Sequence, residues 1–189
     1  MKKYKIAVIV GSLRKESFNL KTAKVMMKLA PESFSMELLD IASLPMFNED
    51  LEANPPKEWV ALKEKISKVD GLLFLTPEYN RSVPGVLKNA IDVGSRPYGK
   101  SIWDGKPAAI VSISPGNLSA FGANHHLRQS LVCLNVPTMQ QPEAYIGNVA
   151  ALFDENDNLI NEQTKVFMTK FIEAFAKWVN TNVKNNHTA

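Results

Sequence analysis

The chain has 189 residues, of which 45% are hydrophobic and 22% charged, proportions typical of a globular protein with a full core. Its net charge of +3 is too small and too dispersed to indicate nucleic-acid binding. No apolar run approaches the length of a membrane span and no signal-peptide core precedes the first apolar run, so we expect neither a membrane partner nor secretion.

A single cysteine, Cys133, excludes an intrachain disulfide framework and fits a reducing cytoplasm, where we expect the protein to be located. It stands in the apolar run 131–134, so we predict a buried structural thiol and not a nucleophile. We expect one domain over residues 1–184 and a frayed tail over residues 185–189.

The first expected strand covers residues 4–10, a short apolar run rich in Ile and Val. A polar turn follows it, and residues 19–29 then have the apolar spacing of a helix. The N–H groups of a helix's first turn are free and carry partial positive charge, so this turn is a favourable place for an anion. The side chains that can donate to a phosphate there are Ser12, Arg14, Ser17 and Asn19.

This turn has only one glycine, Gly11, so it is neither a dinucleotide-binding G-x-G-x-x-G loop nor a P-loop. Hydroxyl and amide donors in place of glycine suit a terminal phosphomonoester that is held from one side. The same residues also fit an ordinary polar turn in which Ser17 or Asn19 only caps the helix. The turn alone leaves both interpretations open.

Strands and helices are then predicted in alternation, interrupted by a long loop over residues 42–56. The further strands are expected at residues 36–41, 71–76, 107–114 and 136–139. The further helices are expected around residues 59–69, after Pro84, over 121–134 and around 167–178, the last with a core stripe of Phe167, Phe171, Phe175 and Trp178. This alternation predicts an α/β protein with a five-stranded parallel sheet between helices, a three-layer sandwich of the flavodoxin-like order 2-1-3-4-5.

In that topology ligands bind at the carboxyl ends of strands one and three, where the strand order reverses. The turn that starts at Gly11 follows strand one, the loop that starts at Pro77 follows strand three, and the loop that starts at Ser114 follows strand four. Because three polar loops converge on one edge, the phosphate-site interpretation of the first turn is favoured over a simple cap.

The loop over residues 77–82 suits a flat heteroaromatic ring, which needs hydrogen bonds at its edges and apolar contact on its faces. Backbone groups in a turn stiffened by Pro77 supply the first, and Tyr79 supplies the second. Asn80 tolerates unusual backbone angles. The loop also fits a plain strand-to-helix connection in which Asn80 or Ser82 caps the helix.

Together these motifs resemble the NAD(P)H-dependent FMN reductase family, in particular its chromate- and quinone-reductase branch. The matching stretches are G-S-L-R-K-E-S-F-N from Gly11, T-P-E-Y-N-R-S-V-P-G-V-L-K-N-A-I-D from Thr76, G-K-P from Gly105 and H-L-R-Q from His126. The resemblance extends from the first strand to about Ala144, in family order and spacing. It implies bound FMN as cofactor and NADPH or NADH as electron donor.

The resemblance also implies which residues contact FMN. The phosphate would be held by Ser12, Arg14, Ser17, Asn19 and the backbone of Leu20. The isoalloxazine would lie along Pro77, Glu78, Tyr79 and Asn80, with Ser114 and Gly116 at its far edge or at the ribityl chain. No catalytic side chain is implied, because hydride passes from NAD(P)H to FMN N5 and the electrons then pass to an acceptor.

Acceptors implied by the resemblance are quinones, free flavins, azo compounds and chromate. Arg96 and Arg81 are candidates for attracting an anionic acceptor or the donor's phosphates, and each also fits a solvated charge. Relatives form dimers or tetramers through the helix after Pro84, which implies a homodimer or homotetramer. No metal is expected at His125 and His126, because adjacent helical residues point about 100° apart and no third ligand has suitable spacing.

Two other functions fit the same fold. A flavodoxin-like electron carrier is the first, but such carriers tend to be strongly acidic, whereas this chain is slightly basic and carries Arg14 in its first loop. A flavin-free phospholigand-binding or regulatory domain is the second, and a response regulator would need clustered carboxylates at the strand ends to hold magnesium. Direct oxidation of NAD(P)H distinguishes the enzyme from the carrier, which waits for a partner reductase.

Overall fold

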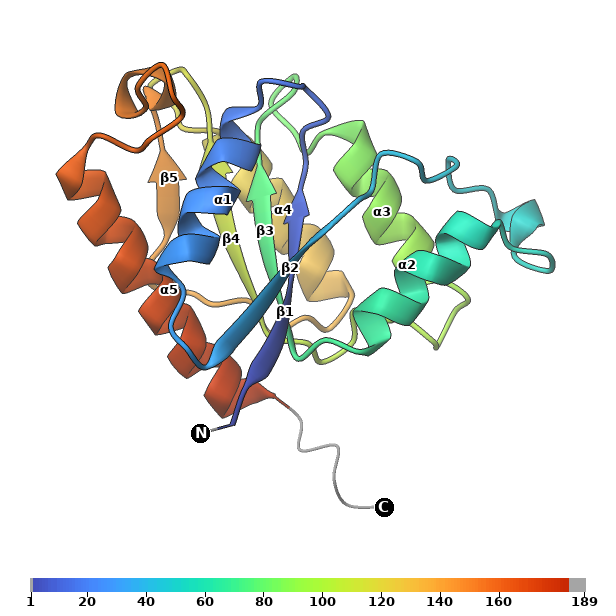
Figure 1. The fold of residues 1–189 in the computed structure, drawn as a ribbon. Coiled ribbons are helices and arrows are strands. Elements are labelled where there is room, and N and C mark those ends of the chain that lie inside the picture. The colour runs from blue at the N-terminus through green and yellow to red at the C-terminus, as the bar shows by residue number, and fades with distance from the viewer. Residues whose placement is uncertain (1, 184–189) are drawn as a thin grey trace.

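The computed structural model describes residues 2–183, which form a five-stranded parallel sheet between two layers of helices (Figure 1). The strands are β1 (Tyr4–Val10), β2 (Phe34–Leu39), β3 (Gly71–Thr76), β4 (Ala108–Ile113) and β5 (Ala144–Ile146). The helices are α1 (Phe18–Leu29), α2 (Lys57–Ser67), α3 (Gly85–Ser95), α4 (Phe121–Cys133) and α5 (Glu162–Asn182). The strand order β2-β1-β3-β4-β5 confirms the predicted flavodoxin-like topology. The tail expected at residues 185–189 lies outside the described part of the chain.

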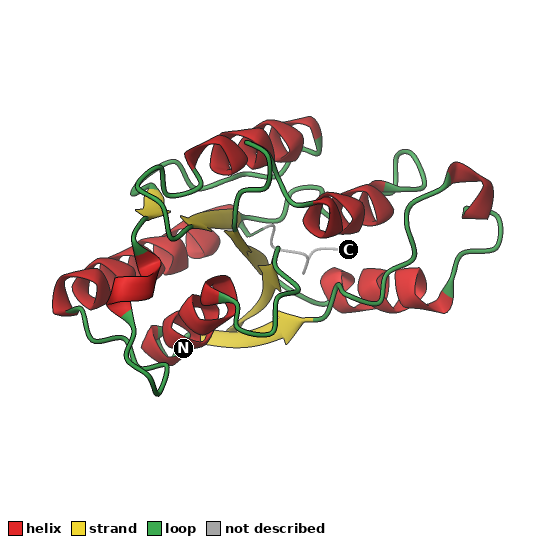
Figure 2. Ribbon diagram, turned by 90° about the horizontal axis from the view of Figure 1, so that it is seen from above, coloured by secondary structure: helices red, strands yellow, loops and turns green. Residues whose placement is uncertain are grey.

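Two hydrophobic clusters fill the space on either side of the sheet, and the view from above shows helices on both of its faces (Figure 2). Met26 of α1 and Phe171 of α5 belong to one cluster, while Trp59 of α2, Leu87 of α3 and Leu127 of α4 belong to the other. Strands β3 and β4 are buried along their whole length, which explains why their sequences are continuous apolar runs. No helix among residues 2–183 combines the length and apolarity that crossing a membrane requires.

The fifth strand was predicted wrongly. Residues 136–139 run alongside the start of β4 but pair with it at a single bridge, between Ala108 and Thr138. Pro137 has no N–H with which to continue a ladder. Regular pairing with β4 resumes only at Ala144, so β5 is Ala144–Ile146. Strand β2 also lies slightly earlier than expected, because the Asp40 carboxylate accepts a hydrogen bond from the Ala42 N–H at 2.8 Å and turns the chain.

The predicted burial of Cys133 was also wrong, because this residue is exposed at the end of α4. Leu131 faces the core and is fully buried. Two residues further along a helix the side chain points about 200° away, so Cys133 emerges on the outer side. The apolar run 131–134 thus covers both faces of one helical turn.

Buried polar side chains fix α4 to the sheet. The Asn124 amide donates to Ser112 Oγ at 3.3 Å, and Arg128 Nε donates to Asn124 Oδ1 at 2.9 Å. Arg128 also donates from Nη1 to the Met139 carbonyl at 3.0 Å. The arginine of the H-L-R-Q stretch therefore holds the 136–139 segment against α4.

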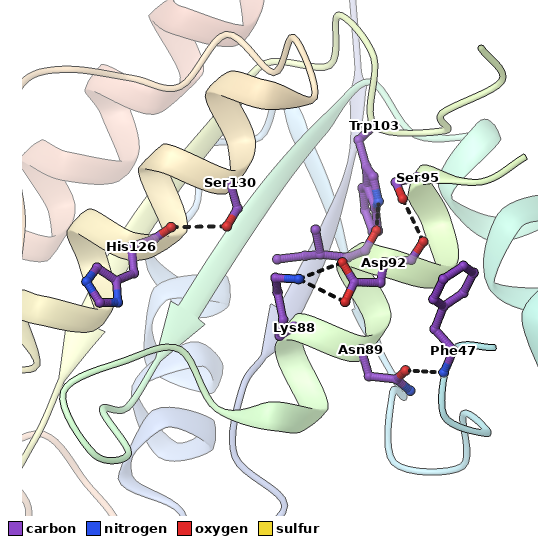
Figure 3. A network of polar contacts seen from close by, with 9 residues as sticks. Phe47, Lys88, Asn89, Asp92, Ser95, Trp103, His126 and Ser130 are labelled. Atoms are coloured by element: carbon purple, nitrogen blue, oxygen red, sulfur yellow. Dashed lines mark hydrogen bonds and ion pairs between the residues drawn. The ribbon is translucent and has the colours of Figure 1, made fainter. Parts of the chain in front are cut away.

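The long loop between β2 and α2 is held against α3 by Asn89 (Figure 3). Asn89 Oδ1 accepts from the Phe47 N–H at 2.7 Å, and its Nδ2 donates to the carbonyls of Leu44 and Pro45 at 3.3 and 3.2 Å. Trp59 Nε1 donates to the same Pro45 carbonyl at 2.9 Å. The segment is therefore fixed by side chains, although its only regular element is the short 3-10 helix Glu49–Leu51.

Gly94 of α3 packs directly on the indole of Trp103, since a Cβ at this position would lie 2.5 Å from two indole atoms. Trp103 is fully buried and donates from Nε1 to the Ile91 carbonyl at 2.9 Å, so it has little room to move. We predict that Gly94→Ala lowers the free energy of unfolding by about 1–3 kcal/mol, measured by urea denaturation. Gly85→Ala is the control, because no atom lies within 4 Å of its Cβ position, and it should change stability by less than about 1 kcal/mol. Equal losses in both variants would contradict the packing explanation.

Candidate functional site

Three loops meet at the carboxyl edge of the sheet, at the top of Figure 1: residues 11–17 after β1, residues 77–84 after β3 and residues 114–120 after β4. The Gly11 N–H donates to the Leu75 carbonyl at 2.8 Å, so the first loop starts against the end of β3. A Cβ on Gly11 would lie 3.0 Å from Leu87 and 3.4 Å from Pro77. Glycine is needed here because the first loop, the second loop and α3 come this close together.

Ser17 is the N-cap residue of α1, and its Oγ accepts a hydrogen bond from the Leu20 N–H at 3.3 Å. The first intrahelical backbone bond runs from the Lys21 N–H to the Ser17 carbonyl at 3.0 Å. Ser17 therefore caps the helix, as the interpretation of this stretch as an ordinary polar turn requires. Capping uses its oxygen as acceptor and leaves its hydroxyl proton free to be donated, while the N–H groups of Phe18 and Asn19 have no intrahelical partner.

Asn19 is buried and joins the first turn of α1 to the end of β4. Its Nδ2 makes only a long hydrogen bond, 3.5 Å, to the Ile113 carbonyl. Its Oδ1 has no partner among the described residues, and the same holds for Oγ1 of the buried Thr22. Buried polar atoms without partners are costly, so this inner face of α1 fits a bound polar group or water that completes its hydrogen bonds.

The other residues predicted for the phosphate are Ser12, which is partly buried, and Arg14, which is exposed. Arg14 Nε donates to the Glu16 carbonyl at 3.0 Å, and the guanidinium lies 5.4 Å from the centre of the Phe18 ring. The Arg14 side chain thus lies against its own loop and keeps a positive charge there. The loop thus combines a cation, hydroxyl donors and a helix N-terminus, which is the donor set that an anion needs.

The loop after β3 is a tight hairpin. The N–H of Tyr79 donates to the Ser82 carbonyl and the N–H of Ser82 to the Tyr79 carbonyl, both at 3.1 Å. The two central residues, Asn80 and Arg81, have φ angles of 51° and 66°, as in a type I′ turn. Asparagine tolerates this left-handed region, as expected, but arginine adopts it at a cost in strain. Strained backbone of this kind concentrates at functional loops.

The Glu78 side chain points away from its own loop to the start of α4. Its Oε2 accepts from the Ala123 N–H at 3.0 Å, and its Oε1 lies 3.5 Å from Arg81 Nη1. The N-cap residue of α4, Ala120, has no side-chain oxygen, so Glu78 supplies the cap and a favourable negative charge. The Glu78 side chain therefore joins the loop to α4. No local signal could reveal this contact, because its partners are 45 positions apart.

The loop after β4 is exposed over residues 115–118 and is held by hydrogen bonds within its own turn. Ser114 Oγ donates to the Gly116 carbonyl at 3.1 Å, which also accepts from the Ser119 N–H at 3.2 Å. Gly116 is exposed, and its Cβ position lies 3.9 Å from the nearest atom, Ser114 Oγ. The two residues predicted for the far edge of the ring therefore lie together on one turn.

An aromatic cluster that sequence reasoning missed lies at the start of α4. The ring centres of Phe121 and His125 are 4.3 Å apart, and Tyr145 of β5 lies 5.4 Å from Phe121. The Tyr145 hydroxyl donates to Glu143 at 2.8 Å and lies 3.1 Å from His125 Nε2. Burial, together with the Glu143 carboxylate, raises the pKa of Tyr145 to about 12, so this hydroxyl remains protonated at neutral pH.

Both arginines predicted to attract anions are paired with carboxylates. Arg96 donates to Glu52 at 2.5 Å and to Glu49 at 2.6 Å, which ties the β2–α2 loop to the end of α3. The hydrogen bonds that Arg96 donates to these carboxylates, the one to Glu52 first, raise the pKa of Arg96. Arg81 pairs with Glu78. Within residues 2–183 no three potential metal-ligating side chains of His, Cys, Asp or Glu come together.

Comparison with known proteins gives consistent matches. The family model for NADPH-dependent FMN reductase matches residues 4–151. A quinone reductase of Pseudomonas putida is 56% identical over 180 residues, which cover 95% of this chain and 96% of that protein. A 2-hydroxy-1,4-benzoquinone reductase of a Burkholderia species is 45% identical over 175 residues, covering 93% and 96%. The solved structure of the flavoenzyme NAD(P)H:(acceptor) oxidoreductase from Paracoccus denitrificans has a TM-score of 0.90 and 42% identity, and the match covers 96% of this chain and 100% of that one.

Gly122 allows the hairpin after β3 to approach α4, since a Cβ there would lie 2.9 Å from the Arg81 carbonyl oxygen and from Glu78 Oε2. We predict that Gly122→Ala pushes the hairpin outward and raises the hydrogen-exchange rates of the Tyr79 and Ser82 amides about tenfold, measured by NMR. Gly116→Ala, at a glycine in open space, is the control and should leave both rates unchanged. Unchanged rates in Gly122→Ala would show that the hairpin does not depend on this contact.

Proposed function

Because the chain belongs to the NADPH-dependent FMN reductase family, we propose that it passes electrons from NAD(P)H to quinones through FMN held at the carboxyl edge of its sheet. The family defines the enzyme class, an NAD(P)H-dependent reductase with FMN as cofactor, as predicted. The observation that carries the proposed site is the buried Asn19 at the N-terminus of α1: its Nδ2 makes only one long hydrogen bond, of 3.5 Å, and can donate to a phosphate oxygen, while its Oδ1, which lacks a partner among the described residues, can accept from a hydroxyl group.

The phosphate of FMN is proposed to bind at the first loop and the start of α1. The backbone N–H groups of Phe18 and Asn19 and the hydroxyl of Ser17 can donate to it, and Arg14 adds a cation on the same loop. Charge-assisted hydrogen bonds of this kind contribute about 1.5–3 kcal/mol each. The Asn19 amide makes only a long bond to Ile113, so it can turn toward a bound group at little cost.

The flavin ring is proposed to lie along residues 77–80, with Ser114 and Gly116 at its other edge. Bound FMN supplies a ring that accepts hydride from NAD(P)H and gives electrons to an acceptor. The role of the protein is to position this ring. The hairpin after β3, which Glu78 joins to α4, supports that role. Tyr79 is half exposed and is available for contact with a ring face.

A quinone is the acceptor class with the best support, because relatives that are 56% and 45% identical carry quinone-reductase names. The ion pairs of Arg81 and Arg96 weaken the case for chromate, since an anion would have to compete with Glu78, Glu49 and Glu52 for these cations. Free flavins and azo compounds as acceptors, and the cytoplasmic location, stay predictions.

A homodimer through α3 and α4 is proposed as the assembly, with a tetramer as the larger alternative. A groove of about 580 Å³ separates these helices beside the hairpin and is lined by Val83, Ile91, Gln129, Cys133 and Leu134, among others. Figure 3 shows Lys88 and Asp92 of α3 on one side of the view and His126 and Ser130 of α4 on the other. Lys88 Nζ lies 2.8 Å from an Asp92 oxygen. Because a two-fold interface brings one face against itself, Lys88 of one copy can meet Asp92 of the other there.

The proposed reaction is tested on the purified chain after FMN is added and the excess removed. We expect retained flavin absorption bands that bleach when NADPH is added under nitrogen and return when a benzoquinone is added. Bands that persist in NADPH would indicate an electron carrier of the flavodoxin type. An absence of retained bands would contradict the proposed site.

The proposed interface is tested with Cys133→Arg, which places a long cation on the exposed groove surface. We expect this variant to sediment as a monomer at micromolar concentration while the parent sediments as a dimer or tetramer, because an unpaired charge in an interface is unfavourable. Val132→Arg is the matched control, since Val132 is exposed on the same helical turn but does not line the groove. Loss of assembly in both variants, or in neither, would place the interface elsewhere.

A further inference from the structure

Lys21, in the first turn of α1, makes contacts that connect three separate segments. Its Nζ lies 3.1 Å from Glu16 Oε2 in the β1–α1 loop and also contacts Asp157 Oδ1. Its side chain is only 18% exposed. Side chains on a helix lean toward its N-terminus, so Lys21 reaches back to the loop proposed to hold the phosphate.

Asp157 is held in position by its own turn and does not depend on Lys21 for it. The Asp154 carboxylate accepts hydrogen bonds from the backbone N–H groups of Asn156 and Asn158, at 2.9 and 2.8 Å, and from the Asn158 side chain at 3.0 Å. Asp157 itself has a φ of 62° within this turn. A rigid turn therefore presents a carboxylate to the start of α1.

These two carboxylates lie beside a site proposed for a dianionic phosphate. Glu16 directly precedes Ser17, the N-cap residue of α1. A phosphate group carries a charge near −2 and would be repelled by uncompensated carboxylates in the same loop. Lys21 pairs with both of them, and its Nζ lies 5.6 Å from the centre of the Phe18 ring, the same ring that Arg14 covers. The negative charge of these two carboxylates is thus partly compensated from within α1.

We propose that Lys21 is a positioning residue that compensates part of the negative charge of Glu16 and Asp157, so that the first loop accepts the phosphate of FMN and discriminates FMN from phosphate-free riboflavin. The inference rests on the proposed phosphate site. Lys21 does not itself contact the ligand and determines specificity through the two carboxylates.

The test is fluorescence titration of the flavin-free full-length chain with FMN and with riboflavin. Lys21→Met should weaken FMN binding about tenfold, because two carboxylates then face the phosphate, and should change riboflavin binding by less than about twofold. Lys24→Met is the matched control, because Lys24 is exposed on the next part of α1, and it should leave both dissociation constants within about twofold of the parent.

Asp157→Asn distinguishes two roles of the Lys21–Asp157 contact, charge compensation and structural support, because they predict changes in FMN affinity of opposite sign. Asparagine keeps the left-handed backbone conformation and removes the charge. Charge compensation predicts that Asp157→Asn tightens FMN binding about twofold and restores most of the loss in Lys21→Met. If the Lys21–Asp157 contact only holds the two segments together, Asp157→Asn should weaken FMN binding, and that result would overturn the inference. The direction of the change in FMN affinity distinguishes the two roles even where riboflavin binds too weakly to titrate. A parent chain that binds no FMN would overturn the proposed function itself.

Discussion

The burial of β3 and β4 on both faces is the constraint on which the rest of the structure depends. Strands with no solvent-facing side must be covered by helices above and below, and here α1 and α5 cover one face while α2, α3 and α4 cover the other. All loops after the strands then gather at one edge of the sheet. Between β1 and β3 the chain order reverses, and the loops that start at Gly11 and Pro77 lie on either side of that point. The position of the site follows from burial before any functional residue is considered.

Contacts between distant segments then fix the shape of this edge. Glu78 caps α4, Asn19 reaches the end of β4, and Lys21 contacts the turn that carries Asp157. Each of these contacts joins two segments that a local pattern would leave independent. A cofactor site needs loops held in one arrangement before the ligand arrives, because ordering them afterwards would reduce the affinity. The strained residue Arg81 shows that some stability is given up for this arrangement.

Local patterns were sufficient to predict the sheet order, four of the strands and the three loops of the site. Those features depend on runs of apolar residues and on polar residues that directly follow them. The exposure of Cys133 and the early end of β2 have local causes, whereas two other failures depend on partners far along the chain. Residues 136–139 have strand-like composition, yet Pro137 and the path of the chain leave only one bridge to β4. The side-chain role of Glu78 could not be predicted either, because Ala123 is its partner only in the folded chain.

The distribution of charge distinguishes the two ends of the proposed flavin site. Arg81, Arg96 and Lys21 are each paired with carboxylates, whereas Arg14 has no carboxylate partner among the described residues. The first loop therefore keeps one cation, Arg14, without a carboxylate partner among the described residues, whereas the cation of the hairpin after β3, Arg81, is compensated by Glu78. In the proposed site, this separation would favour the anionic part of FMN at the first loop and leave the hairpin close to neutral. A neutral, planar quinone suits an acceptor site of that kind better than an oxyanion does, because a quinone needs apolar contact with the ring and an oxyanion needs an unpaired cation.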